Sequence, residues 1–230
     1  TLFPYTTLFR STSLGSVMLP RVANLLATGD HRAVNKMHEM SFLIYNLVIF
    51  PMMAGILIVN DDFVQFFLGQ DFQDARYAIA IMIFRMFFIG WTNIMGIQIL
   101  IPHNKNKEFM ISTTAPAIIS VGLNLLFLPK LGYIGAAIVS VSTEALVWAI
   151  QLYFTRRYLK EVLIIGSLTK IVLASAIMYG ILLGSKTLIQ FSPTINVIVF
   201  AVLGGIIYLF AILSMKVIDV KELKQMIRKN

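Results

Sequence analysis

Long apolar runs separated by short polar segments dominate the chain. A helix needs about 20 apolar residues to cross the hydrocarbon core of a bilayer, which is about 30 Å thick. The stretches that meet or approach this length are 41–59, 77–101, 109–128, 133–154, 168–183 and 195–215. We expect each to be a transmembrane helix, although Lys170 near one end weakens the fifth. The pattern predicts an all-α membrane protein, a polytopic bundle of six transmembrane helices.

The composition agrees with a membrane protein and excludes several other classes. Of the 230 residues, 58% are hydrophobic and 13% are charged, with a mean hydropathy of +0.81. This leaves too little polar surface for a water-soluble domain of the same length. The sequence has no cysteine, which excludes disulfide scaffolds, thiolate metal sites and cysteine nucleophiles.

The basic residues sort to one side of the predicted bilayer. One side holds Arg21, Arg32, Lys36, Lys105, Lys107, Arg156, Arg157, Lys160, Lys170, Lys216, Lys221, Lys224, Arg228 and Lys229. The other side holds only Arg76, Lys130 and Lys186. Because Lys and Arg accumulate in cytoplasmic loops, we expect both ends of the chain to face the cytoplasm. Orientation in the lipid bilayer explains the net charge of +8, so we expect no nucleic-acid partner.

Two ionisable residues lie deep inside predicted spans. Arg85 is in the second span and Glu144 is near the middle of the fourth. Charged groups at membrane depth are costly and normally face the bundle interior or a water-filled cavity. Polar residues recur at helical spacing on the second, third and fourth spans. We therefore expect a hydrophilic, substrate-binding cavity lined by Arg85, Glu144, Asn93, Asn124 and Gln151.

A purely structural role for the same residues is the alternative. Arg85 and Glu144 could pair with each other, or with backbone carbonyls, and so hold the bundle together. Hydrogen bonds between helices explain the amide side chains about as well as contacts with a substrate do.

Motifs for catalysis or for metal binding are missing from the sequence. It contains no GxxxxGK[ST], GxSxG or HExxH pattern. His31, His38 and His103 fall in predicted loops or at loop edges, away from clustered carboxylates. We expect no catalytic residue, no metal or other cofactor, and no enzyme activity.

The two ends of the chain differ from the part between them. Residues 1–11, TLFPYTTLFRS, resemble the translation of a widely used sequencing adapter, so we interpret them as an artefact that precedes a fragment. Residues 216–230 form a predicted basic amphipathic tail in the cytoplasm. Between them we expect the end of a truncated helix and a cytoplasmic loop (12–40), four transmembrane helices with a polar cavity face (41–154) and two further transmembrane helices (155–215).

Four segments occur in an order and spacing that we interpret together. They are LPRVANLLATGD (19–30), FPMMAGI (50–56), FFLGQDFQDA (66–75) and LPKLGYIGAAIVSVSTE (128–144). With these segments, the chain resembles the C-terminal half of polysaccharide flippases of the multidrug/oligosaccharidyl-lipid/polysaccharide exporter superfamily.

The resemblance implies a two-lobed bundle, usually of fourteen helices, that moves a lipid-linked oligosaccharide between leaflets by alternating access. This chain would then be the second lobe plus a terminal helix pair, without the first lobe. The implied substrate is an undecaprenyl-diphosphate-linked glycan unit for O-antigen, capsule or exopolysaccharide export across the bacterial inner membrane. Transport would be coupled to H⁺ or Na⁺ or to the membrane potential, and Arg85 and Glu144 are the cavity positions carried over.

Other functions remain open at the level of sequence. A multidrug/cation antiporter or a lipid II flippase of the same superfamily is the nearest alternative. A membrane glycosyltransferase or polymerase also spans the bilayer many times, although the longest predicted outer loop here is short. A purely structural membrane subunit would not require the intramembrane charges Arg85 and Glu144.

Overall fold

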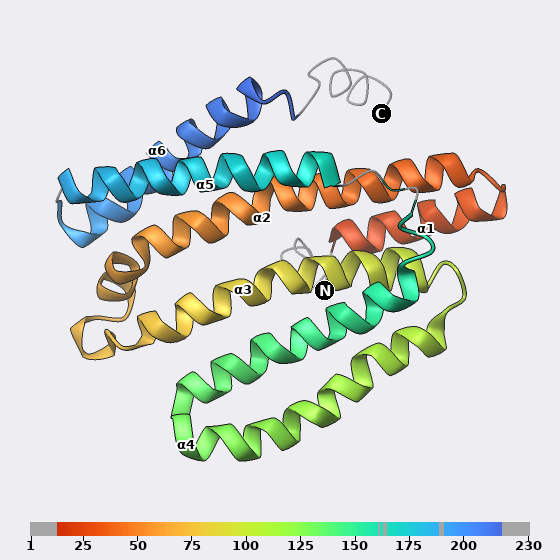
Figure 1. Ribbon diagram of the computed structural model, residues 1–230, viewed down its shortest axis with the longest axis horizontal. Helices are drawn as coiled ribbons and strands as arrows, with labels where there is room; N and C mark the ends of the chain where they lie inside the picture. Colours follow the sequence, from red (N-terminus) through yellow and green to blue (C-terminus); the bar gives the residue numbers. More distant parts are fainter. Residues whose placement is uncertain (1–12, 161, 163–164, 189–190, 218–230) are drawn as a thin grey trace, which may run out of the picture. The chain divides into compact units, whose positions relative to one another are not determined.

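The computed structural model consists of helices joined by short connections (Figure 1). It describes residues 13–160, 162, 165–188 and 191–217. The elements are α1 (Ser13–Ala27), α2 (His31–Phe67), the 3₁₀ turn η1 (Gln70–Phe72), α3 (Ala75–Asn93), the π-helical segment η2 (Ile94–Leu100), α4 (Asn106–Thr155), α5 (Ile165–Leu188) and α6 (Pro193–Ser214). The predicted artefact 1–11 and the predicted tail beyond residue 217 lie outside the described residues.

Five helices in the described part of the chain are long and apolar enough to cross a membrane, namely α2, α3 together with η2, α4, α5 and α6. α4 has 50 residues, which at about 1.5 Å per residue is about 75 Å, more than twice the thickness of a bilayer core. It breaks at Gly132, whose φ of 54° and ψ of −136° are accessible essentially to glycine alone. The two arms of α4 therefore correspond to the third and fourth predicted spans, and the all-α polytopic fold is confirmed.

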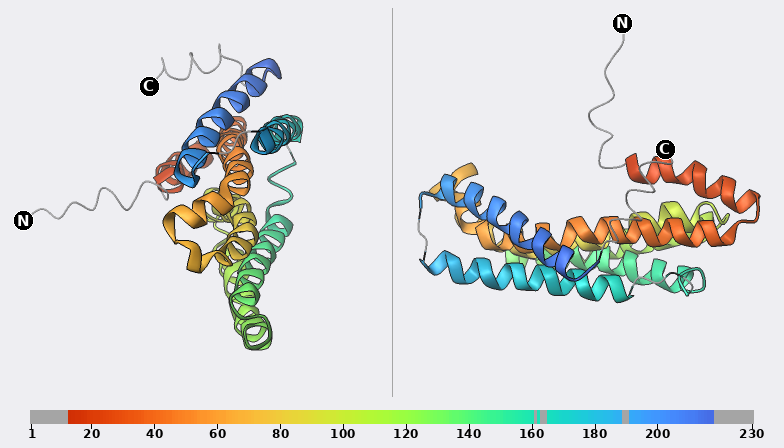
Figure 2. Two further views of the ribbon diagram at one scale, coloured as in Figure 1. Left: turned by 90° about the vertical axis from the view of Figure 1, so that its left-hand side faces the viewer. Right: turned by 90° about the horizontal axis from the view of Figure 1, so that it is seen from above.

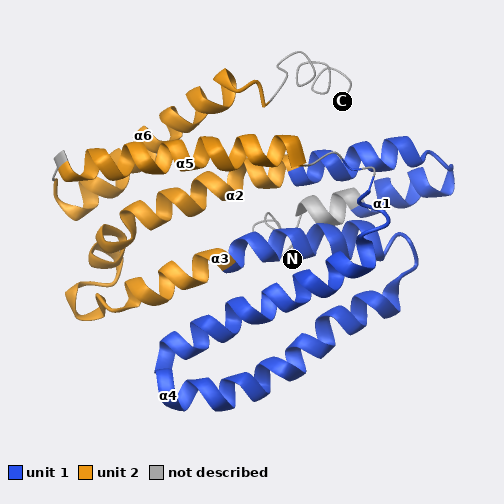
Figure 3. Cartoon of the chain, in the orientation of Figure 1, with its two compact units in different colours: residues 1–42, 85–163 blue, residues 43–84, 164–230 orange. Residues whose placement is uncertain are grey.

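The chain divides into two compact units (Figure 3). Unit 1 comprises residues 1–42 and 85–163, and in it both α1 and α4 pack against η2. The arms of α4 double back on each other at Gly132 (Figure 1). A Cβ atom placed on Gly135 would lie 2.6 Å from the carbonyl oxygen of Phe127, so the turn needs glycine at this position too.

Unit 2 comprises residues 43–84 and 164–230. Its helices α5 and α6 run side by side in opposite directions (Figure 2) and pack against the part of α2 that belongs to this unit. Ile171, Met178 and Phe200 are fully buried in the core between them. The Tyr208 hydroxyl donates a hydrogen bond of 2.9 Å to the carbonyl oxygen of Leu47. Burial of these side chains supplies the main stabilisation of unit 2.

α2 continues to Phe67, beyond the predicted end of the first span at residue 59, and a polar cluster lies in this extension. Lys186 Nζ lies 2.9 Å from Asp62 Oδ2 and also donates to the carbonyl oxygen of Ile58. Asn196 donates to Asp62 Oδ1 at 2.9 Å. The Asp62 carboxylate thus has a cation and an amide as partners, which makes its position within the helix tolerable. The functional division at residues 154 and 155 stays a prediction.

Candidate functional site

The two intramembrane charges predicted from the sequence meet in unit 1. Arg85 comes from α3 and Glu144 from the second arm of α4. Arg85 donates to Glu144 Oε1 from Nη2 at 2.9 Å and from Nε at 3.3 Å. The side chain of Arg85 is 38% exposed and that of Glu144 is 20% exposed, so the ion pair is only half-buried. Part of each side chain therefore lies at the surface.

Aromatic side chains extend this contact along the two helices. Trp148 lies one turn beyond Glu144, and its ring centroid is 5.8 Å from that of Phe88 and 6.3 Å from that of Trp91. Trp91 also packs against Phe42, at 4.8 Å. These ring contacts connect α3 with the second arm of α4 and, through Phe42, with α2. The cluster therefore fixes α3 beside the second arm of α4.

Gln151 lies in a tightly packed junction. It is 1% exposed and donates from Nε2 to Ser112 Oγ at 3.3 Å, which links the two arms of α4. A Cβ atom on Gly96 would lie 3.1 Å from the same Nε2 and 2.6 Å from Cε2 of Phe109. Glycine at position 96 thus lets η2 approach both arms closely.

The two asparagines take different positions. Asn124 donates from Nδ2 to the carbonyl oxygen of Ser120, one turn earlier on the first arm of α4, at 2.9 Å. Asn93 is half-buried at the end of α3, next to η2. The structure thus joins Arg85 with Glu144, whereas Asn124 bonds to its own helix. A substrate-binding role for all five predicted residues stays a prediction.

A buried polar network in unit 1 was not predicted from the sequence. His38 Nε2 lies 3.1 Å from the carbonyl oxygen of Gln98, and Ser41 donates to Gln98 Oε1 at 2.8 Å. All three side chains are buried. The interpretation of His38 as a loop or loop-edge residue is wrong, because α2 begins at His31 and includes it. The three-residue spacing of His38 and Ser41, together with the lone Gln98 in an apolar run, was the available sequence signal.

The network lies against a distorted stretch of helix. Residues 94–100 are π-helical, with the amide of Ile101 bonded to the carbonyl oxygen of Gly96. π-helical segments are rare in proteins overall, but those that occur are often found at functional sites.

No group of three or more His, Asp or Glu side chains in the described ranges is placed to hold a metal ion.

Comparison with known proteins decides the family. Residues 6–223 match the family model described as lipid II flippase MurJ. The chain belongs to the lipid II flippase MurJ family. The predicted membership of the flippase superfamily is thereby confirmed, and the chain is a multi-pass membrane protein of this family.

Three relatives of the MurJ-family chain have sequences similar to it. An uncharacterized membrane protein of Methanocaldococcus jannaschii is 25% identical over 94% of this chain and 42% of its own length. A Haloferax volcanii protein named as a low-salt glycan biosynthesis flippase, Agl15, is 21% identical over 96% of this chain and 47% of its own. An Escherichia coli protein named for O-antigen transport is 33% identical over 39% of this chain and 21% of its own. The chain spans less than half the length of these relatives.

Proposed function

We propose that this MurJ-family chain is part of a flippase that moves undecaprenyl-diphosphate-linked glycan units across the inner membrane for polysaccharide export. The family match over residues 6–223 is the observation that carries the flippase part of the proposal. The names of two relatives, for a glycan biosynthesis flippase and for O-antigen transport, support the glycan as cargo. Because the chain spans 42% and 47% of the two relatives that it matches over nearly its whole length, it would supply about half of the transporter.

The Arg85–Glu144 pair is the proposed switch of this transporter. A guanidinium binds phosphate oxygens through the same fork of N–H groups that it offers to a carboxylate. The diphosphate of the lipid-linked glycan would therefore compete with Glu144 for Arg85. The freed carboxylate would then accept a sugar hydroxyl or take up H⁺ or Na⁺, which couples cargo binding to the driving ion.

The amides complete the proposed cargo site. Asn93, Asn124 and Gln151 would hydrogen-bond sugar hydroxyls when the polar face opens toward the cargo. The polyprenyl chain would stay in the bilayer while the head group crosses. Transport by this route breaks no covalent bond, so we propose a transporter without a catalytic step. We place it in the inner membrane with both ends of the chain in the cytoplasm.

A lipid II flippase is the second candidate, and the description of the matching family favours it. Both cargoes carry a polyprenyl diphosphate, so the Arg85–Glu144 pair suits either. The two differ in the glycan attached to that shared anchor.

Translocation in vesicles tests the proposal and separates the candidates. The complete protein is reconstituted into liposomes with a fluorescent polyprenyl-diphosphate oligosaccharide, with fluorescent lipid II, or with a cationic dye. Protection of the head group from an added quencher measures crossing. We expect the oligosaccharide lipid to cross faster than the other two. Faster crossing of lipid II would assign the second candidate, and crossing of the dye alone would overturn both in favour of an antiporter.

A further inference from the structure

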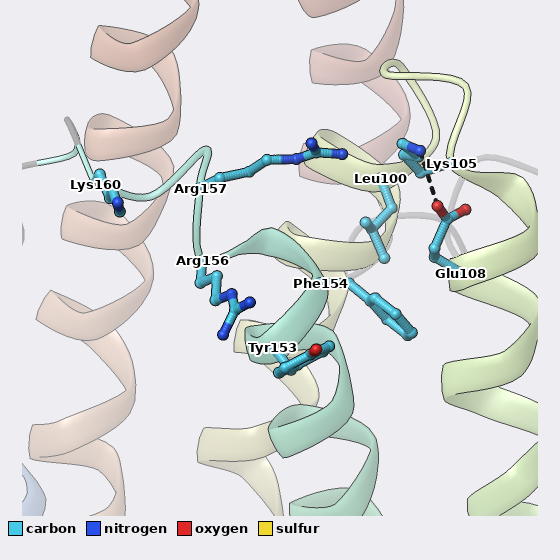
Figure 4. A pocket seen from close by; sticks show the side chains of 8 residues that line it. All are labelled: Leu100, Lys105, Glu108, Tyr153, Phe154, Arg156, Arg157 and Lys160. Carbon is cyan, nitrogen blue, oxygen red and sulfur yellow. Dashed lines mark ion pairs between the residues drawn. The ribbon is translucent and has the colours of Figure 1, made fainter.

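A basic pocket of about 560 Å³ lies in unit 1, where η2 and both arms of α4 end or begin (Figure 4). It is lined by Leu100, Lys105, Glu108, Tyr153, Phe154, Arg156, Arg157 and Lys160. Its volume is within the range of about 300–1,000 Å³ that is typical of small-ligand sites. The pocket is separate from the Arg85–Glu144 pair and was not predicted from the sequence.

The charges of this pocket are unbalanced. Lys105 and Glu108 neutralise each other across 2.9 Å. Within the described ranges, no ion pair joins Arg156, Arg157 or Lys160 to a carboxylate. Among the described residues that line the pocket, four cations thus accompany one carboxylate, and this excess creates a positive potential inside it.

Tyrosine rings hold the two arginines in place. The Arg156 guanidinium lies 4.4 Å from the ring centroid of Tyr153, and that of Arg157 lies 5.1 Å from the ring centroid of Tyr158. These cation–π contacts leave the N–H groups of the guanidinium free to meet an anion. In Figure 4, Arg157 extends toward the segment that carries Lys105, so cations approach the pocket from opposite sides.

The position of the pocket along the helices matches a membrane surface. Its cations lie at the ends of apolar helices, on the side where the sequence places most of the Lys and Arg residues. Tyrosines are enriched at the level of the lipid head groups. Basic pockets between transmembrane helices on the cytoplasmic side bind anionic head groups.

We propose that this pocket binds the phosphate group of an anionic membrane lipid at the cytoplasmic surface. Arg156 and Arg157 contact the phosphate oxygens, and Lys160 supplies a further charge. The phosphate comes either from a phospholipid such as phosphatidylglycerol or from a polyprenyl diphosphate that is waiting to be transported. The inference does not depend on the proposed transport function, because binding can be measured without transport.

Lipid binding by the full-length protein tests this proposal. The protein is purified in detergent, stripped of lipid and titrated with phosphatidylglycerol, with phosphatidylcholine of the same acyl chains, or with undecaprenyl diphosphate. Native mass spectrometry reports the bound fraction. The test variant is Arg156→Gln/Arg157→Gln. The matched control is Arg32→Gln/Lys36→Gln, which removes the same charge from exposed positions outside the pocket on the same predicted side.

We expect the protein to prefer phosphatidylglycerol to phosphatidylcholine by about tenfold or more, and the test variant to lose most of that preference. The control should stay within about twofold of the unmodified protein. A larger loss for undecaprenyl diphosphate than for phosphatidylglycerol assigns the site to the transported lipid, and the reverse assigns it to a phospholipid. Equal binding of phosphatidylglycerol and phosphatidylcholine, or an equal loss in the control, overturns the proposal.

A second measurement covers a test variant that does not fold. In the unmodified protein, raising the salt concentration from about 0.1 to 0.5 M should weaken phosphatidylglycerol binding and leave phosphatidylcholine binding unchanged. Salt-insensitive binding of phosphatidylglycerol overturns the electrostatic site.

Discussion

Arg85 donates two hydrogen bonds to a single carboxylate oxygen of Glu144, across 59 positions of the sequence. Each side chain would be an isolated charge at membrane depth without the other. The pair joins α3 to the second arm of α4 and remains partly exposed.

Replacement of these two residues separates the structural role from transport. We expect Arg85→Gln in the intact protein to abolish glycan export while membrane abundance is preserved. Loss of the partner of Glu144 should lower the free energy of unfolding by about 1–3 kcal/mol, between the values for exposed and buried pairs. The double variant Arg85→Gln/Glu144→Gln should regain stability without regaining export. Thermal unfolding in detergent and an export assay measure the two effects, and normal export by Arg85→Gln would rule out the transport role.

Replacement of glycine by alanine in α4 should destabilise the protein at Gly135, next to the turn, but not at Gly122. In Gly135→Ala the new methyl group meets the backbone oxygen of Phe127 at 2.6 Å, and backbone cannot rotate away as a side chain can. We expect a loss of about 1–3 kcal/mol from overpacking. Gly122→Ala in the same helix has no heavy atom within 4 Å of the added Cβ and should be neutral or stabilising. Equal melting temperatures for the two variants would contradict the close approach of the arms.

The buried network at η2 should show a penalty for leaving one partner unsatisfied. Gln98→Leu removes the acceptor of the Ser41 hydroxyl, which should cost about 1–3 kcal/mol because a buried donor loses its bond. Adding Ser41→Ala removes that stranded hydroxyl, so we expect the double variant to be more stable than Gln98→Leu alone. Denaturant or thermal unfolding of all four combinations gives the coupling energy. Strictly additive losses would show that the two side chains do not interact.

Protonation of His103, which lies in the loop between η2 and α4, should lower the stability of the protein as the pH falls. Its ring stacks on Tyr158 with a centroid distance of 4.1 Å, and Nδ1 lies 2.7 Å from the carbonyl oxygen of Ile99. Burial lowers the pKa of His103 below its ordinary value of 6.5; the hydrogen bond with the Ile99 carbonyl partly opposes this, and the nearby His31 and Arg157 lower the pKa further.

The sign of this effect follows from proton uptake. The unfolded chain binds a proton at His103 as the pH falls through about 6.5, while the folded chain resists it, so stability decreases on acidification until the folded pKa is reached. We expect unfolding curves of the unmodified protein and of His103→Gln to differ increasingly below that pH and to run parallel above it. A constant difference from pH 8 to pH 5 would exclude His103 as the cause.

Local properties of the chain were enough to predict the fold class. Hydrophobic length and the transfer free energy of each side chain are properties of one segment, so the apolar runs indicated the spans without any knowledge of their neighbours. Arg85 and Glu144 were identified in the same way, as charges inside such runs. The order of four short segments was sufficient for the resemblance to the flippase superfamily, which the family match then confirmed.

Contacts between distant segments could be decided only by the tertiary structure. The pairing of Arg85 with Glu144 was one of two alternatives in the sequence, because periodicity gives the face of a helix and not the helix that it meets. His38 was misplaced because the start of α2 at His31 was not recognised, although Asp30 accepts a hydrogen bond from the Ala33 amide there; only the tertiary structure shows its contact with Gln98, sixty positions away. The π-helical stretch 94–100 shifts the face that follows it, and an ideal period cannot predict that shift.

The basic pocket illustrates the same division. Sequence alone predicted that Lys105, Arg156, Arg157 and Lys160 belong to one side of the membrane, since charge and span count are sums along the chain. Only the turn of α4 at Gly132 brings the two ends of that helix together, so that these cations line one pocket. Proximity between residues fifty positions apart arises from packing and backbone geometry, which no single segment of the sequence contains.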